Sequence, residues 1–281
     1  MKKIIKICLL IFPIIIFLFL LKLPWIGEVS QKTTVYFLNV GQGDACFIRT
    51  SSGQNILIDG GPDERVLYEL GKILPWWERE IDLMILTHPH DDHVAGLIKI
   101  LDKYHVGKVL YNGIVSGSPT YEAFLKKLHD KNISTKIITQ VQKIRLDNEC
   151  SLDLIYPRFD ISNQENKNLN NTSIVSRLDC INQDFLFMGD AEKEVEEELL
   201  ASQEEISADI LKVGHHGSET ASAEDFLSRV SPRTAIISVG AENSFGLPDL
   251  QIIRRLERLG IEVRRTDQER TMIYKIEGLN N

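Results

Sequence analysis

Three histidines and two aspartates fall within six residues, in the segment Leu86-Thr-His-Pro-His-Asp-Asp-His-Val-Ala-Gly96. The apolar run Ile81-Asp-Leu-Met-Ile-Leu86 precedes them and is typical of a buried strand. Imidazole nitrogens and carboxylate oxygens are ligands that borderline metals such as zinc accept. A charged loop with one or two hydrogen-bonded histidines is the alternative interpretation. We expect a metal site at the end of a buried strand.

The spacing of these side chains leaves room for two ions. His88 and His90 occupy alternate positions, so both rings can point into one pocket. Asp92 and His93 round the turn into the next helix and can serve a second ion beside the first.

The H-x-H-x-D-H motif resembles the signature of the metallo-β-lactamase superfamily. Six further segments occur in order along the chain: Asn39-Val-Gly-Gln-Gly-Asp-Ala45, Leu57-Ile-Asp-Gly-Gly61, Phe187-Met-Gly-Asp-Ala-Glu192, Leu211-Lys-Val-Gly-His-His-Gly-Ser218, Ile237-Ser-Val-Gly240 and Arg265-Thr-Asp-Gln268. The whole series, from residue 33 to residue 277, resembles the metallo-β-lactamase-like domain of ComEC-type DNA-internalisation (competence) proteins. The resemblance implies an αββα sandwich with metal ligands on the loops at one edge.

The alternation of apolar patterns predicts the same architecture. Strand-like and helix-like segments alternate in two halves, with helices expected at 93–104, 191–203, 222–230 and 249–259 and strands at 35–38, 45–49, 55–58, 173–178, 208–213 and 234–239. Two such halves predict two sheets packed face to face with helices outside, an α/β sandwich. The polar residues 158–171 predict a long surface loop near the metal edge.

The N-terminus predicts a membrane segment. Lys2, Lys3 and Lys6 precede the apolar run 7–21, which is short for a full span but can be extended to Ile26 if Lys22 snorkels. The lysines place the N-terminus inside and the catalytic part outside the membrane. A cleaved signal peptide, giving a secreted protein, is the alternative. We expect an anchor or signal segment at 1–26, a linker at 27–32 and a hydrolase domain at 33–281.

The resemblance implies a ligand for each metal position. His88 and His90 would bind the first metal, Asp92 and His93 the second, and Asp190 would bridge them. Asp190 could instead be the N-cap of the following helix. Of the adjacent His215 and His216, we favour His216 as a ligand and His215 as the residue facing the substrate, and the reverse assignment stays open.

Further residues are expected around the ligands. Asp59 would fix the loop that carries them. Gln42 and Asp44 would form a glycine loop facing the pocket, and Ser218 and Ser244 would contact a phosphate oxygen. His105 and His129 have no partners at ligand spacing, so we expect no site role for them.

Two departures from the family pattern are visible. Many superfamily members supply a third histidine to the first metal, but here the corresponding segment is Asn170-Asn-Thr-Ser173, so Asn171 and Ser173 stand near that position. This poorer ligand set should weaken zinc binding and favour manganese. Leu247 stands where ComEC-type domains commonly have a histidine, which removes a polar group from the substrate side.

Cysteines and arginines leave alternatives open. Buried free thiols are the default for Cys46, Cys150 and Cys180, and a 150–180 disulfide is the alternative if the domain is extracellular. The net charge of −8 argues against a broadly basic nucleic-acid coat. Six arginines near the C-terminus form either a solvated helix face or a groove for a phosphate backbone: Arg254, Arg255, Arg258, Arg264, Arg265 and Arg270.

The N-terminal segment and the ligand pattern predict a membrane-anchored hydrolase with two divalent ions, zinc or manganese, and the resemblance to competence proteins implies a phosphodiesterase or nuclease that acts on DNA. Asp92, Asp190 and His215 would be the catalytic residues. A role in DNA uptake would require a separate translocation channel as partner. A cell-surface phosphoesterase, similar to enzymes that remove phosphocholine, is one alternative, and a binding domain without catalysis is another.

Overall fold

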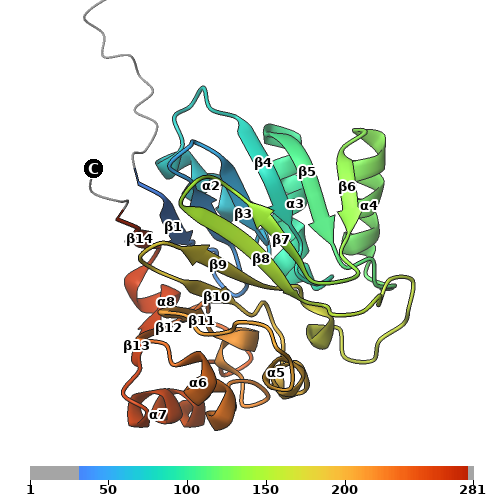
Figure 1. Ribbon diagram of the computed structural model, residues 1–281. Helices are drawn as coiled ribbons and strands as arrows, with labels where there is room; N and C mark the ends of the chain where they lie inside the picture. Colours follow the sequence, from blue (N-terminus) through green and yellow to red (C-terminus); the bar gives the residue numbers. More distant parts are fainter. Residues whose placement is uncertain (1–31, 278–281) are drawn as a thin grey trace, which may run out of the picture.

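The computed structural model describes residues 32–277 and has the predicted sandwich architecture (Figure 1). Two seven-stranded sheets lie face to face, with strand orders β14-β1-β2-β3-β4-β5-β6 and β13-β12-β11-β10-β9-β8-β7. Within the described residues no helix is long and apolar enough to cross a bilayer. The predicted membrane segment at residues 1–26 lies outside the described residues.

The elements of each half follow one another along the chain, apart from β14. The first sheet and its helices comprise β1 (Thr34–Phe37), β2 (Cys46–Arg49), β3 (Asn55–Ile58), α2 (Arg65–Ile73), β4 (Glu80–Ile85), α3 (Asp91–Lys103), β5 (His105–Tyr111), α4 (Pro119–Asp130), β6 (Ser134–Ile137) and β14 (Met272–Lys275). The second half comprises β7 (Gln142–Arg145), β8 (Cys150–Tyr156), η1 (Asn170–Thr172), β9 (Val175–Cys180), β10 (Phe185–Phe187), α5 (Lys193–Leu200), β11 (Ile210–Lys212), η2 (Gly214–Gly217), α6 (Glu224–Val230), β12 (Thr234–Ile237), α7 (Leu250–Arg258), β13 (Glu262–Arg265) and α8 (Thr266–Glu269).

Three apolar layers hold the sheets and helices together. The middle layer lies between the sheets, where the ring of Phe37 on β1 packs 5.9 Å from the ring of Phe187 on β10. One outer layer is covered by α2, α3 and α4, and the other by α5, α6 and α7 (Figure 1). Since the central strands are buried on both faces, their sequences read as continuous apolar runs rather than alternating ones.

The helix that carries the motif packs closely on the neighbouring strand end. Val94 and Leu97 of α3 are fully buried, and Asp91 and Asp92 in its first turn complement the positive end of the helix dipole. Gly96 allows the contact, because a Cβ there would lie 1.8 Å from the Gly60 carbonyl oxygen. The helix start is thereby held against the turn after β3.

One predicted strand is displaced. The strand predicted to start at residue 173 starts two residues later, at Val175, as β9. A 3₁₀ turn over Asn170–Thr172 precedes it. Ser173 is withdrawn from the sheet because its hydroxyl accepts a hydrogen bond from the Asp190 amide at 3.0 Å. The difference brings a polar turn, rather than a strand end, to the metal edge.

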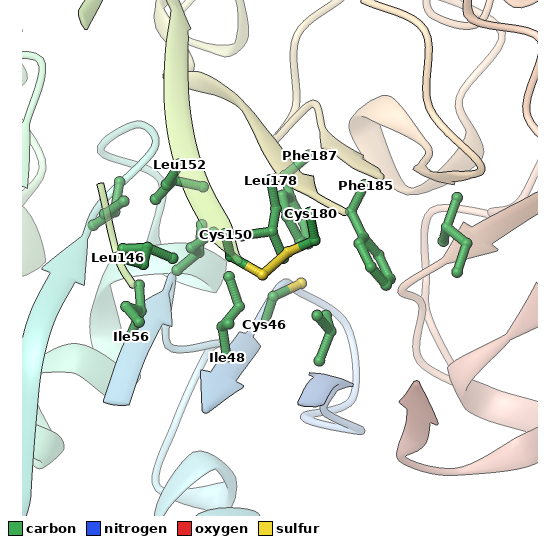
Figure 2. Close-up of a cluster of buried hydrophobic side chains, with 14 of the residues drawn as sticks. Cys46, Ile48, Ile56, Leu146, Cys150, Leu152, Leu178, Cys180, Phe185 and Phe187 are labelled. Carbon is green, nitrogen blue, oxygen red and sulfur yellow. A yellow bond between two sulfur atoms is a disulfide. The ribbon is translucent and has the colours of Figure 1, made fainter. Parts of the chain in front are cut away.

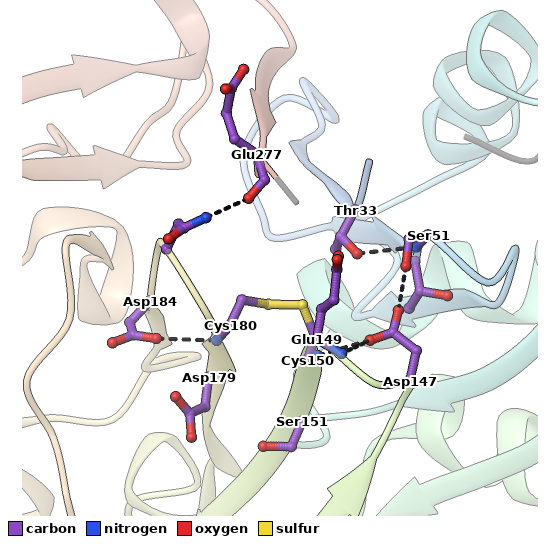
Figure 3. The surroundings of a disulfide bond; sticks show 12 residues. Thr33, Ser51, Asp147, Glu149, Cys150, Ser151, Asp179, Cys180, Asp184 and Glu277 are labelled. Carbon is purple, nitrogen blue, oxygen red and sulfur yellow. Dashed lines mark hydrogen bonds between the residues drawn. A yellow bond between two sulfur atoms is a disulfide. The ribbon is translucent and has the colours of Figure 1, made fainter. Parts of the chain in front are cut away.

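The free-thiol assignment of two cysteines was wrong. Cys150 of β8 and Cys180 of β9 are direct register partners in an antiparallel pair and form a disulfide. Figure 2 shows this bond among the apolar side chains of the middle layer, near the free and buried Cys46. Asp147 and Asp184 flank it and accept hydrogen bonds from the amides of Cys150 and Cys180, at 2.8 and 3.1 Å (Figure 3).

Replacing both Cys150 and Cys180 by serine is expected to lower the free energy of unfolding by about 2–4 kcal/mol, because the unfolded chain regains the entropy that the cross-link removes. Urea unfolding of wild type and variant, each with and without reductant, measures the effect. Reductant should shift the wild-type midpoint to that of the variant and leave the variant unchanged. A wild-type midpoint that is insensitive to reductant would contradict the bond.

Candidate metal centre

The ends of parallel strands in both sheets bring the candidate ligands to one edge of the sandwich. β4 runs parallel to β3, so His88 after β4 and Asp59 after β3 emerge side by side. β10 runs parallel to β11 in the second sheet, and these strands lead into Asp190 and into the turn with His216. Ligands that lie far apart in the sequence therefore meet where strands of both sheets end.

The structure brings six of the predicted side chains together in two groups. Their candidate ligand atoms lie within 4.8 Å of one another inside each group. One group contains His88, His90 and Asp190, and the other contains Asp92, His93, Asp190 and His216. Asp190 belongs to both, as a carboxylate that bridges two ions must.

One oxygen of Asp190 faces three imidazoles. Its Oδ2 lies 3.3 Å from Nε2 of His93, 3.4 Å from Nε2 of His216 and 3.7 Å from Nε2 of His88. Oδ2 of Asp92 lies 3.1 Å from the same His216 nitrogen. These atoms all point toward a common space rather than away from it.

The hydrogen bonds of the three buried histidines orient them as metal ligands. Nδ1 of His93 is held by Asp59 at 2.8 Å and Nδ1 of His216 by the Ser238 carbonyl oxygen at 2.9 Å. Nδ1 of His88 lies 3.1 Å from the Thr87 hydroxyl. Each ring therefore turns Nε2 into the cluster, which is the usual arrangement around a metal-bound histidine.

Unpaired atoms show that this cluster is suited to a cation. Nε2 of His93 and Oδ1 of Asp190 are buried and have no hydrogen-bond partner among the described residues. Buried polar atoms are normally paired, and leaving one unpaired is costly. Two buried carboxylates and several inward-facing imidazole nitrogens fit divalent metal ions.

Asp59 lies behind the ligands and contacts His93 and Thr87, the residue before His88. Its Oδ1 accepts from the Thr87 amide at 2.8 Å, and its Oδ2 accepts from the Thr87 hydroxyl at 2.7 Å and faces His93. Asp59 adopts a left-handed φ of 59°, which is uncommon for a residue other than glycine. The turn after β3 is thus committed to holding the ligand loop.

In the second group, the histidines and the carboxylates shift one another's pKa values strongly. Burial alone would lower the pKa of His216, but the carboxylates of Asp190, Asp44 and Asp92 outweigh it and raise the pKa to about 10. The pKa of Asp190 is held well below its usual value because His216 and His93 outweigh the effect of burial. Protons on the histidines therefore balance the carboxylates when no metal is bound.

The first group behaves differently. Burial, followed by the nearby His93, lowers the pKa of His88 well below its usual value. Burial also lowers the pKa of His90. These two rings are therefore neutral at neutral pH and already in the protonation state that a metal ligand needs.

The adjacent histidines of η2 point to different sides. His215 and His216 have left-handed φ values of 45° and 52°, a conformation that non-glycine residues adopt rarely and that clusters at functional sites. His216 is buried in the metal group, whereas His215 lies at the pocket wall with its Nδ1 2.9 Å from Oε1 of Glu192. This placement agrees with His216 as the candidate ligand and His215 as the candidate substrate-facing residue.

The chain matches the family described as the Metallo-beta-lactamase superfamily over residues 38–241. The chain belongs to this superfamily. It is 30% identical to ComE operon protein 3 of Bacillus subtilis over 88% of this chain and 33% of that protein. It is 31% identical to Recombination protein 2 of Haemophilus influenzae over 92% of this chain and 30% of that protein. The chain thus spans about a third of the length of these relatives.

Solved structures share the superfamily fold at low sequence identity. Igni18, a metallo hydrolase from Ignicoccus hospitalis, is 16% identical with a TM-score of 0.55 and covers 87% of this chain and 100% of its own. CmlA, a diiron beta-hydroxylase from Streptomyces venezuelae, is 13% identical with a TM-score of 0.55 and covers 87% of this chain and 54% of its own. These likenesses establish the fold. The family match and the metal groups together describe a metallo-hydrolase, and Competence protein ComA of Neisseria gonorrhoeae, 27% identical over 86% of this chain and 32% of that protein, is also among its relatives.

No third imidazole joins His88 and His90 within the described residues. Ser173, at the position predicted for that ligand, lies behind His88 instead, with its hydroxyl 3.3 Å from Nδ1 of the ring. Asn170, which sequence reasoning passed over in favour of Asn171, lines the pocket and donates to Glu192 at 3.0 Å. Asn171 does not line the pocket, and its side-chain amide donates to Glu194 instead.

The remaining predicted residues lie in different places. Gln42 lines the pocket, but Asp44 is buried behind the metal groups, where its Oδ1 lies 3.4 Å from Nδ1 of His216. Ser218 accepts a hydrogen bond from the Thr220 hydroxyl at 3.0 Å, and neither Ser218 nor Ser244 lines the pocket.

Lys212 was not identified as part of the site. This fully buried residue of β11 forms a close ion pair with Asp44, donates to the Gly189 carbonyl oxygen at 2.9 Å and lies 4.0 Å from Oδ1 of Asp190. The signal was present in the sequence, since a lysine interrupts the apolar strand Ile210-Leu-Lys-Val213. A buried charge in such a place is expected to be paired.

Metal binding at pH 8 is expected to release roughly two protons, one from His216 and one from His93, because the carboxylates around them raise the pKa of His216 to about 10 and that of His93 well above its usual value, and only the neutral imidazole binds a metal. Calorimetric titration in two buffers of different ionisation enthalpy measures the proton count. His216→Ala should reduce it, and His129→Ala, on the exposed end of α4, should not. Binding enthalpies that are equal in the two buffers would contradict the charge state.

Proposed function

We propose that this protein is a metal-dependent phosphodiesterase that cleaves DNA outside the cytoplasmic membrane. The observation that supports the chemistry is the single carboxylate, Asp190, shared by two ligand groups at the floor of an open pocket. When bound, two adjacent divalent ions that share such a carboxylate would neutralise the charge on a phosphoryl group and activate a water molecule for attack on its phosphorus. Similarity to competence proteins supports DNA as the substrate.

Six residues would hold the ions: His88, His90, Asp92, His93, Asp190 and His216. Their backing residues keep these side chains in place, with Asp59 behind His93 and Asp44 with Lys212 behind His216. Preorganisation of this kind avoids reorganisation during the reaction. The first position offers two imidazoles and one carboxylate and no third histidine among the described residues, so we propose manganese as the working ion over zinc.

His215 is placed to handle the proton of the leaving oxygen. Its ring is partly exposed at the pocket wall, with Glu192 and the Thr220 hydroxyl on the Nδ1 side, at 2.9 and 3.1 Å. Glu192 is itself held by Asn170 and Thr220. This carboxylate orients the imidazole at the pocket wall, as a general acid requires.

Location and partners are part of the same proposal. The Cys150–Cys180 disulfide supports an oxidising compartment, because such bonds are rare in the cytosol. The lysine-flanked apolar segment 7–21 supports a membrane anchor with the hydrolase domain outside. A separate DNA-translocation channel would be its partner in uptake.

The C-terminal arginines do not supply the DNA contact in this proposal. Arg258 pairs with Glu224 and Arg265 with Asp267, so their charges are largely neutralised. Neither they nor the other arginines of the predicted cluster line the metal pocket. Arg254 and Arg258 lie exposed on α7, as the solvated-face alternative expects, whereas Arg264 and Arg265 lie half-buried on β13.

Asp190→Ala is expected to lower metal-dependent cleavage of single-stranded DNA by roughly 10³-fold, because the bridging ligand contributes several kcal/mol of charge stabilisation. Cleavage is measured with the metal-free protein before and after addition of manganese or zinc. Asp102→Ala, at the exposed end of α3, is the matched control and should keep full activity. Hydrolysis of bis-p-nitrophenyl phosphate alone would favour a surface phosphoesterase, and no turnover with either metal would favour a binding domain.

A further inference from the structure

One wall of the metal pocket is apolar and solvent-facing. The pocket has a volume of about 490 Å³, and Phe245, Leu247 and Pro62 line it together with the candidate ligands. The Phe245 side chain is 71% exposed. A phosphodiester has no use for an apolar wall, so this surface is suited to a part of the substrate other than the phosphate.

The loop that carries Phe245 is built to present it. The Asn243 side-chain oxygen accepts from the amides of Phe245 and Leu247, at 3.2 and 3.0 Å. Its side-chain nitrogen donates to the carbonyl oxygens of Gly240 and Leu247, at 2.8 and 2.7 Å. The side chain of Asn243 therefore holds the loop in its conformation through four hydrogen bonds to the loop backbone.

Both ends of this loop are joined to the metal edge. The Gly240 amide donates to the Gln42 side chain at 3.1 Å, and Gln42 lines the same pocket. The Asp249 amide donates to the carbonyl oxygen of Gly217, the residue after His216. Phe245 is thus held at a set position relative to the candidate ligands.

We propose that Phe245 is a stacking platform for the nucleobase next to the scissile phosphate. The inference rests on the proposed function and deepens it by naming the substrate as an unpaired nucleotide. A nucleobase is flat and apolar on its faces and polar on its edge, which matches a pocket lined by an exposed ring and by the side-chain amides of Gln42 and Asn170. Stacking requires that the base leave its neighbours, so single-stranded DNA is preferred over duplex. Every base has such a face, so cleavage tolerates any sequence.

The test uses a substrate with one scissile bond. Thymidylyl-thymidine is compared with its two analogues in which the 5′ or the 3′ base is absent. Loss of the stacked base is expected to lower kcat/KM of the wild type roughly 5- to 100-fold for one analogue. Phe245→Ala should lower kcat/KM on the complete dinucleotide by a similar factor and show no further loss on that analogue.

Matched variants separate stacking from apolar contact and from folding. Phe245→Trp should keep the discrimination between substrates, and Phe245→Leu should lose most of it. Phe159→Ala removes another exposed phenylalanine that does not line the pocket, and should leave all rates unchanged. Equal losses on all three substrates in Phe245→Ala, or no loss, would overturn the inference.

Failure of the inference can be told from failure of the proposed function. A wild type that cleaves oligothymidylate as fast as Phe245→Ala does would overturn the stacking role and leave the nuclease intact. A wild type that cleaves no nucleotide would overturn the nuclease. In that case, tryptophan emission of Phe245→Trp still tests the platform, since thymidylyl-thymidine should quench it, and no quenching would refute it.

Discussion

The buried charge at the metal edge is the constraint on which the rest of the structure depends. Asp44, Asp59 and Asp190 are all almost fully buried, and Asp92 is close to them. Carboxylates in such proximity repel one another unless cations lie between them. Here protonated His93 and His216 and the buried Lys212 provide that balance, and the inward-facing imidazole nitrogens leave room for metal ions to take over part of it.

The two sheets of the sandwich each supply side chains to this buried group of charges. The first sheet supplies Asp59 and His88 from the ends of β3 and β4, and the second supplies Asp190 and His216 from the ends of β10 and β11. The apolar layer between the sheets holds those ends in register. A small displacement of one sheet against the other would separate Asp190 from His93, so packing far from the site sets its geometry.

The fold and the four candidate ligands of the motif could be predicted because both are expressed in local patterns, whereas Asp190 and His216 were expected only from the resemblance to the family. The motif at residues 88–93 and the apolar runs around it are short-range patterns that depend on neither sheet order nor register. The Cys150–Cys180 bond, by contrast, follows from the pairing of β8 with β9, which no local pattern specifies. Asn170 was missed because the 3₁₀ turn before β9 rotates it into the pocket in place of Asn171.

The roles of Lys212 and Glu192 became visible only in the tertiary structure, for different reasons. The pairing of Lys212 with Asp44 joins residues in different halves of the chain. Glu192 looked like an ordinary acidic residue at the start of a helix, and its role became visible only from its contact with His215. In both cases the residue types were evident, but their partners were not.

The central proposal is that this chain binds two ions that share Asp190, without a third histidine at the first position. Anomalous diffraction from crystals of the manganese-loaded protein tests it most directly. The account predicts two peaks on either side of Asp190, roughly 3.5–4 Å apart. A single peak beside Asp92, His93 and His216, with none beside His88 and His90 at saturating manganese, would contradict it.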